Sequence, residues 1–138
     1  MQVTNAVYPK GEQLGEAVAN GVNKPIVMVN LLKFKDKALY KDGRAGAGDG
    51  RTAYNRYGDE MRAFVESHGG RILFIGEVKS LVIGNVEEMW DAVALVEYPS
   101  SEAFVRIAMS PEVAKFGIHR EAGLEGQLLI QTLQTTAA

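Results

Sequence analysis

The chain has 138 residues, no cysteine and a formal net charge of −2. A chain of this length can bury enough apolar surface to fold as one domain without covalent cross-links. The absence of cysteine excludes disulfides, thiolate metal ligands and a cysteine nucleophile. The charges are interspersed, no apolar run reaches the length of a membrane span, and the first residues lack the pattern of a signal peptide. We therefore expect a cytoplasmic protein with neither nucleic-acid nor membrane partners.

One domain over residues 1–138 is predicted, with a core over 24–134. Residues 1–23 form an N-terminal helical extension, with a helix near 11–20. The core begins with a strand at 26–34, IVMVNLLKF, which directly follows a proline.

A glycine-rich stretch, AGAGDGRT, lies within a loop that we predict over residues 36–51. It resembles in part the G-x-x-x-x-G-K-[ST] pattern, in which backbone N–H groups surround phosphates and the lysine reaches the terminal ones. Ala45 stands where this pattern needs its first glycine, and Arg51 stands where it needs the lysine. We therefore interpret the segment as a flexible or lid-like loop and not as a nucleotide site.

Residues 52–68 have the spacing of an amphipathic helix. Their apolar and aromatic side chains, which include Tyr54 and Tyr57, recur every three or four positions and so share one face. His68 falls at the end of that face. The pair Gly69-Gly70 should end the helix, because glycine readily adopts the conformation found just past a helix C-terminus.

Two antiparallel strands are predicted next. The first is long, over residues 71–84, with a bulge or bend at Gly76. The second, over 89–98, returns through a short turn near Asn85, because so few residues cannot form a parallel crossover.

Two helix starts follow this pair of strands. Ser100 is a suitable N-cap for the first helix, and Ser110 with Pro111 marks a second start, in which proline occupies the first helical position. Gly123 closes the second helix, and the last strand is predicted at 127–133. The order β-α-β-β-α-β, with the second helix in two pieces, predicts a ferredoxin-like α+β fold with an antiparallel sheet and an extra N-terminal helix.

The predicted strands are apolar on both faces. In the first strand Ile26 and Met28 lie on one face and Val27 and Val29 on the other. In the next two strands, alternation assigns Ile72, Phe74, Trp90 and Val96 to one face and Leu73, Ile75, Val93 and Leu95 to the other. Because helices cover only one face, the second face should be buried by another subunit. We predict a homodimer whose sheets face each other.

Five segments together resemble the domain-of-unknown-function family thirteen-thirty, in the dimeric α+β-barrel superfamily. The segments are PIVMVNLLKF, YNRYGDEM, HGGRILFIGEV, WDAVALVEYPSSEAF and MSPEVAKFGIHREAGL. The resemblance spans residues 25–133. Its most specific parts are the Gly-Gly before the second strand, the Glu-aromatic-Pro-Ser after the third, and the Ser-Pro-Glu of the last helix.

This resemblance implies the ferredoxin-like fold and the dimer, and it implies no established reaction. The N-terminal helix and the 36–51 insertion depart from the shorter members of the family. Superfamilies of similar fold include cofactor-independent monooxygenases, muconolactone-isomerase-like enzymes and haem-degrading proteins, a likeness of fold that does not transmit function.

Five residues are candidates for catalysis. His68 and Asp91 are the candidates for moving a proton, and Tyr57, His119 and Arg120 are the candidates for polarising an oxygen. His68 also fits a histidine packed beside the glycine pair, and His119 also fits a structural or surface residue. Two histidines without a ligand one helical turn away do not form a metal site, so we expect neither metal nor cofactor.

Four further residues are candidates for binding a ligand: Asn30, Tyr54, Trp90 and Glu97. Asn30 interrupts an apolar strand and needs polar partners, either to fix register or to contact a ligand. Tyr54 and Trp90 also fit core positions. Glu97 shares a strand face with Asp91, where a carboxylate among apolar side chains would have a raised pKa, and both also fit pairing with a nearby arginine.

Two functions remain open. The first is a cofactor-free enzyme, an isomerase or monooxygenase-like, that binds a small hydrophobic or aromatic metabolite in an apolar cleft between helices and sheet. The second is a non-catalytic dimeric module that binds a small ligand or contributes an interface. An enzyme needs an acid–base group beside an open cavity. A structural dimer would fill that cleft with Phe64, Phe74 and Trp90 and pair both histidines elsewhere.

Overall fold

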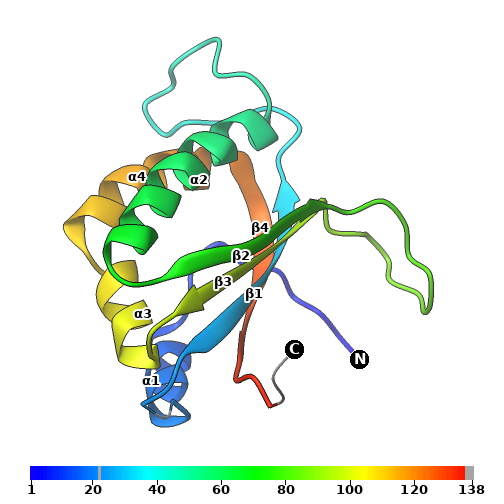
Figure 1. The fold of residues 1–138 in the computed structure, drawn as a ribbon. Coiled ribbons are helices and arrows are strands. Elements are labelled where there is room, and N and C mark those ends of the chain that lie inside the picture. The colour runs from blue at the N-terminus through cyan, green and yellow to red at the C-terminus, as the bar shows by residue number, and fades with distance from the viewer. Residues whose placement is uncertain (22, 136–138) are drawn as a thin grey trace.

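The computed structural model describes residues 1–21 and 23–135, in which helices gather on one side of a four-stranded antiparallel sheet (Figure 1). The elements in chain order are α1 Gly11–Ala19, β1 Ile26–Phe34, α2 Gly50–Ser67, β2 Arg71–Glu77, β3 Ala92–Tyr98, α3 Ser101–Ala108, α4 Pro111–Gly123 and β4 Leu124–Thr132. The strand order β2-β3-β1-β4 is that of the ferredoxin-like fold. The predicted α+β class and fold are confirmed. Residues 22 and 136–138, which the predicted domain includes, lie outside the described residues.

Polar side chains fix the starts of three helices. The hydroxyl groups of Ser100 and Ser110 accept hydrogen bonds from backbone amides three residues on, at 3.1 and 3.3 Å, and so cap α3 and α4 as predicted. Asp49 caps α2 by accepting from the amide of Thr52 at 2.7 Å. This cap starts α2 at Gly50, two residues before the predicted start.

The core lies between the helices and the side chains of the sheet that face them. Its main cluster combines sheet residues with residues of α2 and α3, namely Ile26, Met28, Val65, Tyr98, Phe104 and Ile107. A second cluster lies at the other end of β1, around Leu32, Phe34 and Leu124. Leu14 of α1 packs against the main cluster, which places the N-terminal helix on the same face of the sheet as the other helices.

The register of β2 corrects two predictions. Its irregularity falls between Ile72 and Phe74, and not at Gly76. Ile72 pairs with Val96, whereas Phe74 pairs with Leu95, so the extra residue turns Phe74 to the face opposite Ile72. Simple alternation had placed these two side chains on the same face. Phe74 is therefore 54% exposed on the side of the sheet away from the helices.

The connection between β2 and β3 is longer than predicted. β2 ends at Glu77 and β3 begins at Ala92, so residues 78–91 replace the expected short turn. Figure 1 shows this connection extending away from the sheet. It carries Val82 and Ile83, each 88% exposed, which continue the apolar pattern of the strand without pairing in the sheet.

Helices α2 and α4 meet where α2 begins and α4 ends, through Gly50 and Gly123. The backbone of Lys35 joins them, because its N–H donates to the Gly123 carbonyl at 2.8 Å and its carbonyl accepts from the Gly50 amide at 3.0 Å. A Cβ on Gly50 would lie 2.1 Å from the Lys35 carbonyl oxygen, and one on Gly123 would lie 2.2 Å from the Gly50 carbonyl oxygen. Only glycine fits at both positions. β4 then begins at once, at Leu124, three residues before its predicted start.

Replacing Gly123 with alanine should destabilise this contact. Because the new methyl group meets backbone atoms, which cannot rotate away, we expect Gly123→Ala to lower the free energy of unfolding by about 2–3 kcal/mol. Gly58→Ala is the matched control, since Gly58 lies within α2 and a Cβ there meets nothing within 4 Å. That control should raise stability by about 0.5–1 kcal/mol, because alanine is the better helix former. Urea unfolding measures both, and equal effects would contradict the close contact.

Candidate functional site

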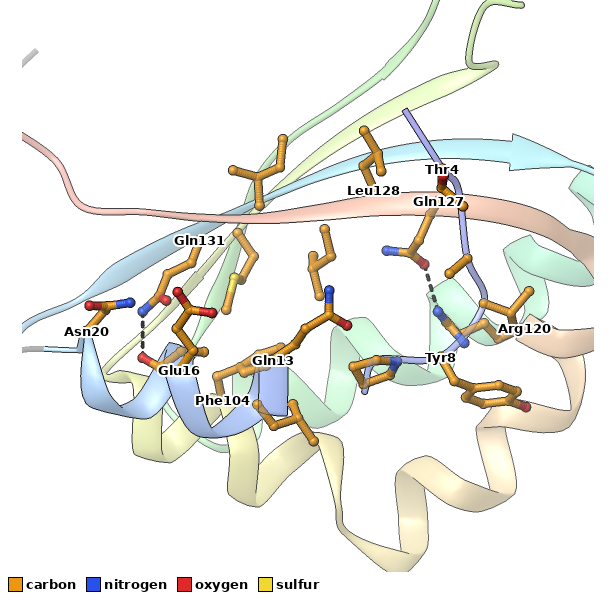
Figure 2. A pocket seen from close by; sticks show the side chains of 18 residues that line it. Thr4, Tyr8, Gln13, Glu16, Asn20, Phe104, Arg120, Gln127, Leu128 and Gln131 are labelled. Carbon is orange, nitrogen blue, oxygen red and sulfur yellow. Dashed lines mark hydrogen bonds between the residues drawn. The ribbon is translucent and has the colours of Figure 1, made fainter. Parts of the chain in front are cut away.

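A pocket of about 450 Å³ lies between the N-terminal part of the chain and β4. Residues 4–9 and α1 form one wall, and residues 127–131 of β4 form the other. Met28 of β1 also lines the pocket, and Phe104 of α3 and Arg120 of α4 complete the lining. Figure 2 shows the last two side chains. This volume is within the range of small-molecule sites.

Hydrogen bonds at Asn5, Ala6 and Tyr8 hold the N-terminal segment in place. The Asn5 side-chain oxygen accepts from the indole N–H of Trp90 at 2.7 Å. Ala6 pairs with Gln127 through two backbone hydrogen bonds of 3.1 and 2.8 Å. The Tyr8 hydroxyl donates to a carboxylate of α4. The extension therefore forms a fixed wall of the pocket.

Arg120 reaches the pocket from α4 and is held by a chain of amide side chains. Its Nη2 donates to Gln127 Oε1 at 2.8 Å, and Gln127 Nε2 donates to Asn30 Oδ1 at 3.3 Å. Asn30 Nδ2 in turn donates to the Ala94 carbonyl at 3.2 Å. Gln127 is only 8% exposed, so this chain fixes the guanidinium from the buried side. Within the described residues, the other N–H groups of Arg120 form no hydrogen bond and are free for a ligand.

The charge of Arg120 is uncompensated, since it forms no ion pair in the described part of the chain. Its neighbour Glu121 is engaged elsewhere, with Lys41 Nζ at 2.8 Å and with the Tyr8 hydroxyl. These hydrogen bonds, the one from Lys41 first, lower the pKa of Glu121 and keep it ionised and paired. The Tyr8 ring adds a cation–π contact, 5.6 Å from Arg120 Cζ to the ring centroid.

The rest of the lining is largely apolar in the middle, where Gln13 is a polar exception, and polar at the far end. The apolar residues include Leu14, Ala17, Met28, Phe104 and Leu129. Figure 2 shows Arg120 and Gln127 at one end, and Glu16, Asn20 and Gln131 at the other. The pocket thus presents a cationic end, an apolar body and an end that carries a carboxylate.

The two candidate histidines lie outside this pocket. His68 is exposed at the end of α2, where its Nδ1 lies 2.8 Å from the Phe64 carbonyl oxygen. His119 Nδ1 lies 2.7 Å from the Tyr40 hydroxyl oxygen, which also accepts from Arg56 Nη1 at 3.0 Å. Since Arg56 can only donate, the Tyr40 hydroxyl is free to donate to His119 Nδ1.

Each of the two candidate carboxylates contacts a neighbouring strand of the sheet. Asp91 Oδ2 accepts from the Phe34 backbone amide at 2.8 Å, and Asp91 lies just before β3. Glu97 faces away from the helices and pairs with Arg71 at 2.8 Å. Neither side chain lines the pocket, so the structure does not bring the predicted acid–base residues together.

The candidate aromatic residues also lie outside the lining. Tyr54 and Tyr57 pack on each other with ring centroids 5.3 Å apart, and burial raises the pKa of both hydroxyl groups. Trp90 lies in the connection before β3 and is half-buried, which corrects its predicted place within a strand. Of the nine candidate residues, Arg120 alone is in the described lining, with Asn30 behind it.

The glycine-rich loop packs against α2 and α4 and does not cover the pocket. Its Tyr40 is 4% exposed and joins a small cluster with Ala53 and Ala122. The Leu39 amide donates to the Ala122 carbonyl at 2.9 Å. None of residues 36–51, all of which the structure describes, lines the pocket.

Gln127, Glu16 and Tyr8 were missed as site residues. In QLLIQTL, Gln127 and Gln131 lie on the same, core-facing side of an otherwise apolar strand, and these two polar residues are the sequence signal that could have indicated the site.

Among residues 1–21 and 23–135, no cluster of His, Asp or Glu side chains could hold a metal ion. No described helix is long and apolar enough to cross a membrane.

Comparison with known proteins identifies relatives of unknown function. A family model described as "Domain of unknown function (DUF1330)" matches residues 48–132. The crystal structure of a protein of unknown function from Rhodopseudomonas palustris is 31% identical, with a TM-score of 0.85, and the match covers 97% of this chain and 100% of that one. A methylated form of that protein matches at 32% identity with the same TM-score, over 97% of this chain and 98% of the other. No curated protein matches this chain.

The Tyr40 hydroxyl should contribute to stability through its two hydrogen bonds. Tyr40→Phe leaves His119 and Arg56 without this partner, and we expect a loss of about 1–2 kcal/mol in the free energy of unfolding. Tyr57→Phe is the matched control, because the Tyr57 hydroxyl forms no hydrogen bond to the described residues, and it should change stability by less than about 0.5 kcal/mol. Urea titration at neutral pH measures both. The hydrogen-bond assignment is wrong if the two variants are equally stable.

Proposed function

The chain belongs to the DUF1330 family, and we propose that it binds a small, largely apolar metabolite through an oxygen anion held by Arg120. One observation carries this proposal: an arginine without an ion pair among the described residues is held by a buried glutamine at one end of an apolar pocket. A guanidinium presents paired N–H groups whose geometry matches a carboxylate. A carboxylate would supply the charge partner that the described residues do not.

The middle of the pocket favours an apolar body on this ligand. Met28, Phe104 and Leu129 face it from three different elements. Burying an apolar chain against them is favourable by about 25 cal/mol for each Å² removed from water. A small aliphatic or aromatic carboxylate would pair with Arg120 and would also fill the apolar middle of the pocket.

Binding is better supported than catalysis. The titratable groups of the described lining are Tyr8, Glu16 and Arg120, and both histidines are engaged elsewhere. An isomerase or a cofactor-free oxygenase needs a proton acceptor beside the anionic oxygen of its substrate. Glu16, the one carboxylate of that lining, lies at the opposite end from Arg120 (Figure 2). A non-catalytic ligand-binding module is therefore the function that we propose.

Octanoate should bind this pocket through Arg120. We expect octanoate to bind the wild-type protein more tightly than octan-1-ol, and Arg120→Gln to weaken octanoate binding by about tenfold to a hundredfold, because a charged hydrogen-bonded pair is lost. Gln127→Glu should have the same effect, since the new carboxylate would pair with Arg120 itself. Isothermal titration calorimetry at neutral pH measures these affinities.

Arg106→Gln is the control for net charge, because Arg106 is exposed on α3 and lies outside the lining. It should leave octanoate binding unchanged. The proposal fails if octanoate does not bind the wild-type protein, or if Arg120→Gln binds it as tightly as wild type does.

We also infer a homodimer formed through the face of the sheet that the described helices leave uncovered. Apolar residues from all four strands lie on this face, namely Val27, Val29, Leu31, Phe74, Val93, Leu95, Leu128 and Ile130. An antiparallel sheet that faces water normally carries polar residues on its wet side. Phe74 and Ile130 are 54% and 45% exposed in the single chain, and a continuous apolar surface of this kind favours burial against a second copy.

Charges on this face should separate the two copies. We expect the double variant Phe74→Asp/Ile130→Asp to be monomeric, because it would bury carboxylates between the sheets. Met109→Asp is the control, since Met109 is 70% exposed at the end of α3 on the helical side and should leave a dimer intact. Light scattering after size-exclusion chromatography gives the masses. A monomeric wild-type protein would contradict the inference.

A further inference from the structure

We propose that Glu16 makes the pocket selective for monocarboxylates, by excluding ligands that carry a second acidic group at the end remote from Arg120. This inference rests on the proposed function, because it takes Arg120 as the anchor of the ligand. It names the substrate class: carboxylates whose far end is apolar or carries a hydroxyl or amino group.

Two glutamines of β4 mark the ends of the pocket. Gln127 holds Arg120, and Gln131 lies beside Glu16 and Asn20 at the other end (Figure 2). Gln127 and Gln131 pair with Leu32 and Met28 of β1 and so face the helices together. Four residues along a strand span about 13 Å. A ligand anchored at Arg120 therefore brings its far end to Glu16 only when it is an extended chain.

The carboxylate of Glu16 is not neutralised. Within the described residues it forms no ion pair, and Arg120 is the one lysine or arginine of the lining. The Gln131 amide nitrogen is not a partner for it, because it donates to Ser101 Oγ at 2.7 Å and to the Ala17 carbonyl at 3.2 Å. Glu16 lies on α1, whose Leu14 is partly buried and packs against the main core cluster. A negative charge is thus built into the far end.

Like charges at this end would weaken binding of a dicarboxylate. Two carboxylates a few Å apart repel each other, and because Glu16 is exposed on α1 this repulsion is strongest at low ionic strength. A terminal ammonium group would instead be attracted to Glu16 and would complete a pair at each end. We therefore expect the affinity to decrease from ω-aminooctanoate to octanoate and from octanoate to octanedioate.

The test compares these three ligands on the wild-type protein, Glu16→Gln and Glu12→Gln by isothermal titration calorimetry at low salt and neutral pH. Glu12 is the matched control, because it lies on α1, is exposed, and does not line the pocket. We expect the wild-type protein to bind octanedioate about threefold to fivefold more weakly than octanoate. Glu16→Gln should bring octanedioate to about the affinity of octanoate and weaken ω-aminooctanoate, with octanoate unchanged. Glu12→Gln should behave as wild type.

Two results would overturn the role of Glu16 while leaving the proposed function in place. One is equal binding of octanoate and octanedioate to the wild-type protein. The other is discrimination that persists in Glu16→Gln. If none of the three ligands binds the wild-type protein, the anchoring role of Arg120 fails and the selectivity fails with it.

Discussion

The close contact of Gly50 and Gly123, joined by the Lys35 backbone, is the constraint on which the site depends. It locks the start of α2, the end of α4 and the exit of β1 at one point. Arg120 lies three residues before Gly123 and Gln127 lies four residues after it, on opposite sides of the turn from helix into strand. The position of the cation and that of its partner are therefore both set by a contact that involves no side chain larger than hydrogen.

The chain of amides from Asn30 through Gln127 to Arg120 combines a structural and a functional role. Buried polar groups must be hydrogen-bonded, and these groups satisfy one another across β1, β4 and α4. This series of hydrogen bonds links β1, β4 and α4 and also orients the guanidinium. A substitution at Gln127 consequently affects both stability and the pocket, so variants that change the charge of Arg120 itself give the cleaner test of binding.

Local signals predicted the fold well, whereas the pocket required knowledge of the assembled chain. The bounds of β1 and the caps at Ser100 and Ser110 follow from alternation and capping chemistry, which act over a few residues. The strand predicted over 71–84 is too long, because Val82 and its neighbours keep a strand-like apolar pattern although no described residue pairs with them in the sheet. The pocket lies between residues 4–20 and residues 127–131, and no local sequence pattern indicates that segments so far apart in the chain lie together.

The bond between Trp90 and Asn5 gives the molecule an optical reporter of its own. Trp90 is the one tryptophan in the sequence, and its indole N–H is tied to the segment that walls the pocket. Because residues 4–9 wall the pocket, a ligand that shifts this segment would change the surroundings of the indole. The intrinsic fluorescence of the unlabelled protein therefore reports whether this wall keeps its position when a ligand binds.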